Sequence, residues 1–371
     1  MIYTLALQSI LFNYTSDAPS ILLNAGSAKS VYENRNNILD IFPDATPTLV
    51  RQLQSDWTNV LKAAEKEIEW CEKKHVSVLS LLSDGYPERL KTCTDAPIAI
   101  FYRGTADLNS QHIISIVGTR EATTYGKDSV HEIVSGLKKH FPDTIIVSGL
   151  AYGIDVCSHR EALKAGMETI GVVAHGLDTI YPAANRPIAR DMLQQGGVLS
   201  EYPSGTRIEK VNFLRRNRIV AGLSDAVIVV ESKTRGGSLS TARIANEYNR
   251  EVFAVPGRTS DATSAGCNEL IAASKAIIYT GIDALTDFLG WISETQRNNS
   301  IKQGIEPPLF LELSEEEKCI VDLLHRGDMQ KNMLCTLSGI PSARLSALLF
   351  ELEMKGVVRP LIGGVFHLVK K

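Results

Sequence analysis

Seven short apolar runs that alternate with helical segments constrain the fold of this chain more than any other feature. The runs cover residues 112–117, 144–147, 169–174, 197–200, 225–231, 251–255 and 276–279. Most are continuous rather than alternating, as expected of parallel strands that are covered on both faces. Helices are expected near 125–140, 155–166, 185–195, 215–223 and 238–249. This alternation predicts an α/β fold with a doubly wound sheet.

The sequence predicts further domains on either side of this sheet. Residues 1–80 predict a helical N-terminal domain (SAM/helix-hairpin-helix-like), for which a packing role is favoured over recruitment of partners. The sheet domain is expected over residues 84–295, a polar linker over 296–308 and a small module over 309–371. Three helices followed by a hairpin are predicted in this last module, which is the element order of a winged helix.

Helix signals delimit the elements of the C-terminal module. A capping box that begins at Ser314 predicts a helix to about Arg326, and Ser342 is expected to cap the third helix. The hairpin is expected to turn through Gly363 and Gly364. From residue 313 to the end there are eight Lys or Arg and seven Asp or Glu. This balance favours a protein contact or weak DNA binding over specific reading of bases.

The composition limits where a ligand can bind. The formal net charge is -3, so any binding of nucleic acid must use a local patch. The six cysteines contain no Cys-x-x-Cys pair, which favours reduced thiols and predicts no metal site. The N-terminus lacks a signal-peptide pattern, and no apolar run approaches the roughly 20 residues of a membrane span. We expect a cytoplasmic protein that does not associate with a membrane.

A basic and aromatic segment stands out just before the strand at 225–231. Arg215, Arg216 and Arg218 lie within four residues of one another, close to Phe213 and Lys210. Between residues 205 and 222 there are five basic residues and one acid. Guanidinium groups bind phosphate oxygens through paired hydrogen bonds, and an aromatic ring can stack on a base. The segment therefore predicts a site for an anion, and specifically for single-stranded nucleic acid.

A glycine-rich loop follows the first strand of the predicted parallel sheet. Gly118 permits a tight exit from the strand, and Thr119 and Arg120 then lie where amides and a guanidinium could hold a phosphate. Ligands of doubly wound sheets bind at this end of the strands. A purely structural turn is an equally good interpretation of this loop taken alone. The glycine spacing is not that of a dinucleotide-binding fingerprint, so no nucleotide cofactor is predicted.

A second glycine-rich loop follows the strand at 225–231. Gly236, Gly237 and Ser238 precede a predicted helix, where exposed amides form a favourable place for an anion. Arg235 and Arg243 flank this loop, which makes the signal more specific. The chain contains no Walker sequence, so ATP hydrolysis is not supported.

Three polar side chains in two other loops raise the question of catalysis. Asp155 and His159 are spaced to share a hydrogen bond on a helix, which could serve acid–base chemistry. The favoured interpretation is that Asp155 caps the helix and His159 is a satisfied buried group. His175, after the next strand, is expected to shape its loop rather than to take part in a reaction.

Together these motifs resemble the DprA/Smf family, the DNA-processing protein A of bacterial transformation and recombination. The matching segments occur in family order over about residues 84–290. They are Val117-Gly-Thr-Arg120, Ser148-Gly-Leu-Ala-Tyr-Gly-Ile-Asp155, Leu199-Ser-Glu-Tyr-Pro203, residues 213–224, Gly236-Gly-Ser238 and Val252-Phe-Ala-Val-Pro-Gly257. The resemblance implies an extended Rossmann-like domain that binds single-stranded DNA, forms a homodimer and loads the recombinase RecA, without being an enzyme.

The resemblance also implies roles for individual residues. Arg120 corresponds to an arginine that contacts DNA, and Lys210 and Phe213 correspond to residues that line the same groove. The family usually has proline after this phenylalanine, where the chain has Leu214. Asn217 and Arg218 match an Arg-Asn-Arg motif, part of which is expected to serve the fold rather than touch DNA.

An enzymatic alternative comes from related folds. Phosphoribohydrolases of the lysine-decarboxylase-like type carry the motif Pro-Gly-Gly-x-Gly-Thr-x-x-Glu in the loop that is equivalent to the one after residues 225–231 of this chain. Aligned on the two glycines, the chain has Arg235 for the proline, Leu239 for the third glycine, Ser240 for the threonine and Arg243 for the glutamate. A guanidinium in place of the carboxylate removes the group that would do the chemistry, so a binding protein is the favoured prediction.

Overall fold

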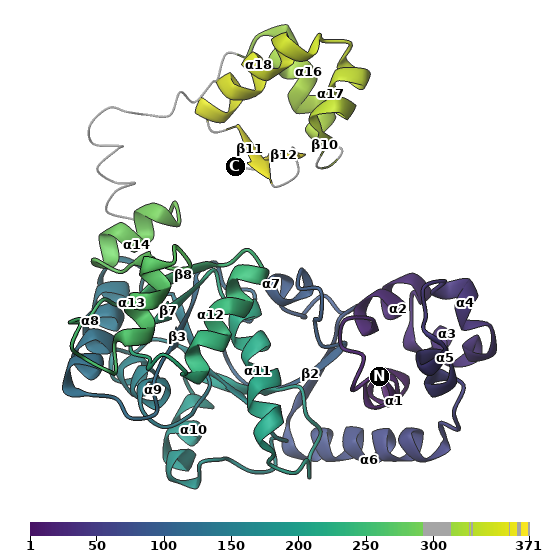
Figure 1. The fold of residues 1–371 in the computed structure, drawn as a ribbon. Coiled ribbons are helices and arrows are strands. Elements are labelled where there is room, and N and C mark those ends of the chain that lie inside the picture. Colours follow the sequence, from purple (N-terminus) through teal and green to yellow (C-terminus); the bar gives the residue numbers. More distant parts are fainter. Residues whose placement is uncertain (292–312, 326, 328, 356, 362–364, 370–371) are drawn as a thin grey trace. The chain divides into compact units, whose positions relative to one another are not determined.

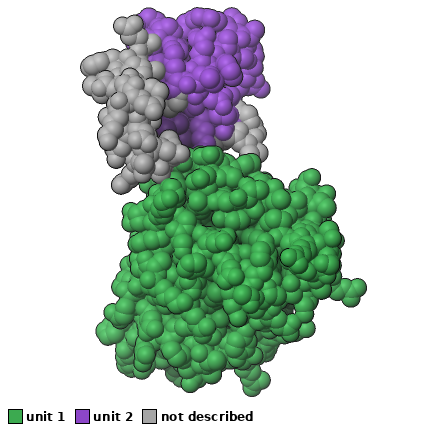
Figure 2. All heavy atoms as spheres, turned by 90° about the vertical axis from the view of Figure 1, so that its left-hand side faces the viewer, with its two compact units in different colours: residues 1–293 green, residues 294–371 purple. Residues whose placement is uncertain are grey.

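The computed structural model describes residues 1–291, 313–325, 327, 329–355, 357–361 and 365–369. The chain divides into two compact units, residues 1–293 and residues 294–371 (Figure 2). The predicted linker at 296–308, the predicted helix end at Arg326 and the predicted turn at Gly363 and Gly364 lie outside the described residues.

A sheet of nine strands forms the centre of the first unit (Figure 1). The strands lie in the order β1-β2-β6-β5-β4-β3-β7-β8-β9, and all neighbours from β6 to β9 are parallel. β1 and β2 add to the β6 edge in antiparallel fashion. The strands are β1 (Ser77–Ser80), β2 (Ala99–Gly104), β3 (Ile113–Val117), β4 (Ile145–Ser148), β5 (Thr169–Val173), β6 (Gly196–Ser200), β7 (Ala226–Val229), β8 (Glu251–Ala254) and β9 (Ile277–Ile278). The predicted α/β fold is confirmed.

Helices cover both faces of this sheet, because successive side chains of each strand point to opposite faces. Ile114, Ile116 and Ile228 pack with residues of α8 (Thr124–His140), α9 (Ile154–Lys164) and α14 (Ile282–Phe288). Ile113 and Val227 pack in a second cluster with residues of α11 (Lys210–Leu223), α12 (Gly237–Glu247) and α13 (Ala265–Ala272). The remaining helical segments of this domain are α7 (Glu88–Lys91), η2 (Ala183–Asn185) and α10 (Arg186–Met192).

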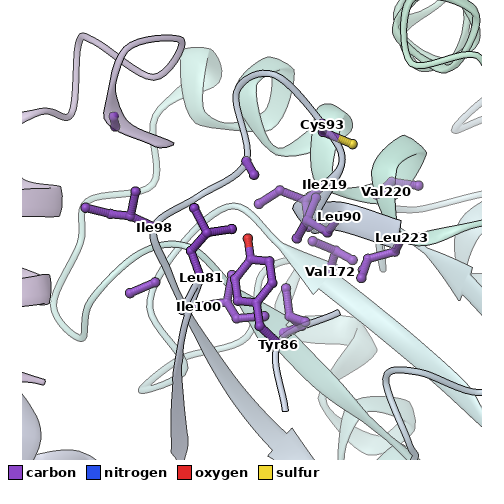
Figure 3. Packing of buried hydrophobic residues seen from close by; sticks show 14 of the residues in the cluster. Leu81, Tyr86, Leu90, Cys93, Ile98, Ile100, Val172, Ile219, Val220 and Leu223 are labelled. Carbon is purple, nitrogen blue, oxygen red and sulfur yellow. The ribbon is translucent and has the colours of Figure 1, made fainter. Parts of the chain in front are cut away.

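The connector between β1 and β2 packs on α11 and fixes this helix (Figure 3). Tyr86 is completely buried in this connector and donates a hydrogen bond from its hydroxyl to the carbonyl oxygen of Pro97, at 2.6 Å. Leu90 belongs to the same buried cluster as Ile219 and Leu223 of α11. α11 begins five residues before the predicted start at 215, so most of the arginine-rich segment is helix.

The N-terminal part of the chain is helical as far as residue 74. β1 lies within the range predicted as helical, so the sheet begins at Ser77 rather than after the predicted boundary at residue 84. Its buried side chains belong to one cluster with those of β2. Gln8 also joins the two parts: its side-chain nitrogen donates to the carbonyl oxygen of Glu201, and its oxygen accepts from the amide of Ala99. The elements are α1 (Ile2–Ile10), α2 (Ala18–Ala25), α3 (Ala28–Glu33), η1 (Arg35–Asn37), α4 (Ile38–Ile41), α5 (Pro47–Leu53) and α6 (Thr58–Lys74).

The second unit has the winged-helix order of elements. These are α16 (Glu315–Leu324), β10 (Met329–Gln330), α17 (Lys331–Ser338), α18 (Ser342–Met354), β11 (Val358–Leu361) and β12 (Val365–Leu368), and its sheet order is β10-β12-β11. The predicted capping box is present, with Glu317 N donating to Ser314 Oγ and Ser314 N donating to the Glu317 carboxylate. Pro341 rather than Ser342 occupies the N-cap of α18, because the helix begins one residue earlier than predicted.

Within the described part of the chain, no single helix is long and apolar enough to cross a membrane. Among the described helices, α17 and α18 form a bent pair that would be long and apolar enough when the two helices are taken together.

Candidate nucleic-acid interface

The candidate site lies beside β3, where the strand order of the sheet changes direction: the strands that follow β3 directly lie on one side of it, and the later strands β7, β8 and β9 lie on the other. β4 lies on one side of β3 and β7 on the other, and all three strands are parallel. Their carboxyl ends therefore meet at one edge of the sheet, which is the usual ligand-binding position of doubly wound folds. The loops that follow β3, β4 and β7 line a pocket of about 690 Å³ together with the first turns of α11.

The loop after β3 is held rigidly beneath the exposed side chain of Arg120. The amide of Thr119 donates to the carbonyl oxygen of Glu231 at 2.7 Å, and the amide of Ile154 donates to the carbonyl oxygen of Thr119 at 3.1 Å. Gly153 has a φ of +77°, and a Cβ atom there would collide with the Thr119 carbonyl. The backbone that carries Arg120 is therefore fixed, while its guanidinium remains exposed at the pocket.

One face of α11 supplies the opposite wall. Lys210, Phe213 and Asn217 are spaced three and four residues apart, so they lie on the same side of the helix. All three line the pocket, and Lys210 is exposed at the first position of the helix. Asn217 Nδ2 donates to the carbonyl oxygen of Gly237 at 3.4 Å, which links this wall to the start of α12.

Two aromatic rings and a guanidinium meet at the pocket. The Phe213 ring contacts the Tyr181 ring edge to face, with centroids 5.8 Å apart, and Arg120 Cζ lies 5.8 Å from the Phe213 centroid. Tyr181 is 46% exposed, so one side of its ring is open to a ligand. The sequence prediction did not include Tyr181. Its position in the sequence could have indicated it, because Tyr181 is an aromatic residue in a loop that follows a parallel strand.

The loop after β7 completes the pocket. Gly236, Gly237 and Ser238 line it at the start of α12, accompanied by the exposed side chains of Lys233 and Arg235. The Ser238 hydroxyl is already engaged, because it donates to Ser232 Oγ at 3.0 Å. Lys233 was not among the predicted residues.

The prediction that Arg216 contacts DNA requires a correction, because its side chain is only 4% exposed. Its Nη1 donates to the carbonyl oxygens of Gly149 and Val172 from the floor of the pocket. Nε is also buried and has no hydrogen-bond partner within the described residues. Arg216 therefore holds α11 against the sheet, and it is not an exposed phosphate ligand.

The same prediction requires correction for Arg218 and Arg215. Arg218 is 5% exposed and pairs with the carboxylate of Glu201, so it cannot reach a ligand in this conformation. Arg215 lies outside the pocket: its Nη2 donates to Asn13 Oδ1 at 3.0 Å, and its Cζ lies 4.5 Å from the ring centroid of Phe12. Both arginines connect α11 to other parts of the fold.

Ten of the twelve residues predicted from the sequence thus line one pocket, and DNA contact stays a prediction for all of them except the buried Arg216. They are Gly118, Thr119, Arg120, Lys210, Phe213, Arg216, Asn217, Gly236, Gly237 and Ser238.

The buried polar groups near the pocket do not form an acid–base pair. Asp155 accepts a hydrogen bond from the amide of Ala151 at 3.4 Å, and burial raises the pKa of its carboxyl group. His159 is completely buried, with Nδ1 2.7 Å from Thr169 Oγ1. The expectation that His159 is fully satisfied is wrong, because its Nε2 has no partner within the described part of the chain.

His175 shapes its loop, as expected, and it also positions an aromatic ring. It is buried, its Nδ1 lies 2.8 Å from the carbonyl oxygen of Gly176, and its Nε2 accepts from the amide of Tyr181 at 3.2 Å. The second contact fixes the backbone from which the Tyr181 ring extends into the pocket.

The pocket lacks an accessible carboxylate among the described residues that line it. Asp155 is the one acidic residue in that lining, and it lies buried beside Arg216. Arg243, which replaces the glutamate of the phosphoribohydrolase pattern, is paired with Glu247 one turn further along α12. The site can therefore bind an anion, but it presents no free general base.

Two families match the chain, one in each unit. The family described as DNA recombination-mediator protein A matches residues 77–290, and the DprA winged helix domain matches residues 306–364. The DNA processing protein DprA of Streptococcus pneumoniae is 42% identical over 209 residues, which are 56% of this chain and 73% of that protein. Protein Smf of Escherichia coli is 32% identical over 332 residues, which are 87% of this chain and 86% of that protein.

Solved structures agree with this assignment. The structure of DprA from Streptococcus pneumoniae has a TM-score of 0.61 at 34% identity and covers 76% of this chain and 95% of that one. DNA processing protein A from Helicobacter pylori has a TM-score of 0.52 at 32% identity and covers 58% of this chain and 95% of that one. Its structure is described in terms of a single-stranded DNA binding mode. These matches confirm the resemblance found in the sequence, and the chain belongs to the DNA recombination-mediator protein A family, the DprA/Smf DNA-processing proteins.

Proposed function

We propose that the protein binds single-stranded DNA in the pocket at the ends of β3, β4 and β7, protects it and delivers it to RecA without altering it chemically. The observation that carries this proposal is the meeting of Arg120, Lys210, Phe213 and Tyr181 at a pocket with no accessible carboxylate among its described lining residues. The related Helicobacter pylori protein, described as binding single-stranded DNA, supports the choice of ligand.

The chemistry of the pocket suits a single strand better than a duplex. Arg120, Lys210 and Arg235 are exposed cations that can neutralise backbone phosphates. The rings of Phe213 and Tyr181 can stack on bases only where those bases are unpaired, at about 1–3 kcal/mol for each base. Stacking and phosphate contacts do not distinguish one base from another, so binding is expected to be largely independent of sequence.

A mobility-shift titration with matched single-stranded and double-stranded oligonucleotides tests this proposal. The wild-type protein is expected to prefer the single strand, and Arg120→Ala and Lys210→Ala are each expected to weaken its binding. Lys139→Ala is the matched control, because Lys139 is an exposed cation in the last turn of α8 and is absent from the pocket lining. Equal affinity for both forms of DNA, or equal effects of all three substitutions, would contradict the proposal.

Base release from nucleoside monophosphates tests the enzymatic alternative. No turnover is expected, because Asp155 is buried and Glu247 is paired with Arg243. If the wild type shows turnover and Asp155→Ala or Glu247→Ala abolishes it, the protein is a hydrolase and the proposal of a binding protein is wrong.

Delivery to RecA and dimerisation rest on membership of the family. The assay for delivery is RecA filament formation on single-stranded DNA that is already covered by a single-stranded DNA-binding protein. The protein is expected to accelerate this step, and Arg120→Ala to reduce the acceleration. If the wild-type protein binds DNA but has no effect on RecA, the delivery function is wrong and the binding function stands.

A further inference from the structure

A second hollow adjoins the DNA pocket at Arg120, which lines both. It has a volume of about 1190 Å³ and lies along α8 and α9, with η2 also contributing to its lining. The DNA pocket ends at the loops after β3 and β4, and the hollow begins at the next residues of the same two loops. A chain that lies in the pocket can therefore pass Arg120 and continue into this hollow.

The charges in the hollow favour an anionic chain. Arg120, Lys127 and Arg160 are exposed and have no ion-pair partner in the described part of the chain. Two of the acidic residues in the lining are already neutralised. Glu121 pairs with Lys233 at 2.7 Å, and Glu161 pairs with Lys164 and His131, which leaves Asp128 as the one unpaired acid among the described lining residues.

An exposed aromatic ring also lines the hollow. Tyr152 is 48% exposed and directly precedes Gly153, whose backbone packs against that of Arg120. An aromatic ring beside unpaired cations is the combination that binds single-stranded nucleic acid in a sequence-tolerant way. The DNA pocket has the same combination in Phe213, Tyr181 and Lys210.

We propose that this hollow is a second subsite for the same single strand. The phosphates of the continuing strand lie against Lys127 and Arg160, and one of its bases stacks on Tyr152. This inference rests on the proposed function, because it extends the strand that the pocket binds.

The first test compares oligonucleotides of different length. Short dT oligonucleotides of about 4 nucleotides are expected to fill the pocket alone, and those of about 16 nucleotides to reach both subsites, a range found among single-stranded DNA-binding folds. Lys127→Gln and Arg160→Gln are expected to weaken binding of the long oligonucleotide by about 3- to 10-fold and to leave the short one unchanged. Each should also lower the slope of log affinity against log salt by about 0.7, the contribution of one phosphate contact on a single strand.

Two further variants complete this test. Tyr152→Ala is expected to weaken binding of the long oligonucleotide by about fivefold or more, without a change in salt slope. Lys139→Gln is the matched control, because Lys139 is an exposed cation of α8 outside the hollow. If the wild type binds the short oligonucleotide but none of the variants differs from Lys139→Gln on the long one, the second subsite is wrong and the proposed function stands. If the wild type binds neither oligonucleotide, the proposed function itself fails.

A native thiol provides a second, independent readout. Cys157 lines the hollow and is partly exposed, whereas Cys319 is exposed in the other unit and serves as the reference. Burial raises the pKa of the Cys157 thiol, so alkylation by N-ethylmaleimide is best followed at mildly alkaline pH. The long oligonucleotide should slow alkylation of Cys157 relative to Cys319, and the short one should not. Equal rates with and without saturating long oligonucleotide, or protection by poly-glutamate but not by DNA, would overturn the proposal.

Discussion

Arg218 of α11 and Glu201 at the end of β6 form an ion pair in the interior, with side-chain exposures of 6% and 8%. Arg218 has a second partner in Asp95, whose carboxylate lies 3.9 Å from the Arg218 Nε, but Glu201 has no other ion-pair partner within the described residues. Removing the arginine therefore leaves the buried Glu201 carboxylate unpaired, which typically costs about 3–5 kcal/mol. Arg218→Met is therefore expected to lower the free energy of unfolding by an amount in this range, as measured by urea denaturation. The double substitution Glu201→Met with Arg218→Met should recover part of the loss, because it removes both charges. If Arg218→Met instead lowers the salt slope of DNA binding and leaves stability unchanged, Arg218 is a DNA ligand.

The two rings of the pocket are expected to contribute through stacking rather than charge. Phe213→Leu and Tyr181→Leu keep apolar bulk but remove the aromatic face, so each should cost about 1–3 kcal/mol of binding free energy. The salt slope should stay at its wild-type value, because no phosphate contact is lost. Fluorescence anisotropy over a range of salt concentrations measures both quantities. Tyr181→Phe is the control and should bind as the wild type does; a loss in this variant would assign the effect to the hydroxyl group.

Arg215 and Arg120 are expected to respond differently to substitution, although both stood out as basic residues in the sequence. Arg120→Gln should lower the salt slope by about 0.7, the contribution of one phosphate contact on a single strand. Arg215→Gln should leave this slope unchanged, because Arg215 is occupied by Asn13 and the Phe12 ring. Salt titrations of the two variants with one oligonucleotide make the comparison. Equal reductions in slope for the two variants would indicate that Arg215 also contacts a phosphate of the DNA.

The alternation of strands and helices could be predicted from the sequence because it depends on local pattern. Continuous apolar runs such as Ile113–Val117 are typical of strands that are buried on both faces, and all five residues of this strand are buried. The glycine loop at Gly118 and Arg120 was predictable for the same reason, since a tight turn after a strand has a local signature. In each case the deciding interactions lie within a few residues.

The roles of the arginines could not be predicted locally, because their partners are distant in sequence. Arg216 donates to the carbonyl oxygens of Gly149 and Val172, and Arg218 pairs with Glu201. These contacts exist only after the sheet has formed. The helical phase of α11 separates exposed from buried positions: positions 210, 213 and 217 form the wall of the pocket, position 216 is buried at its floor, and position 218 faces the interior. The sequence pattern placed the start of this helix at residue 215 rather than at Lys210, so these positions could not be assigned to faces of the helix.

His159 predicts a dependence of stability on pH. Burial lowers the pKa of its imidazole to about 3, from an ordinary value of 6.5. The unfolded chain therefore binds a proton in this pH range that the native state does not, and stability falls as the pH falls from about 6.5 towards about 3. Between about pH 7 and about pH 5 this group alone should cost about 2 kcal/mol. Urea denaturation of the wild type and His159→Gln at both pH values measures the effect. The variant should show a smaller pH dependence, and an unchanged one would show that His159 is not responsible.

The β9 end of the sheet is the surface at which we expect the proposed dimer to form. β9 is the last strand of the sheet, and Ile278 on this strand is 45% exposed. An edge strand with an exposed apolar side chain can pair with another chain, and a lysine on such an edge opposes pairing. Sedimentation equilibrium is expected to show a dimer for the wild type and a monomer for Ile278→Lys. Leu82→Lys is the matched control, because Leu82 is 42% exposed and lies after β1, at the opposite edge of the sheet. A dimer that persists in Ile278→Lys but dissociates in Leu82→Lys would move the interface to the β1 edge, and a monomeric wild type would contradict dimerisation itself.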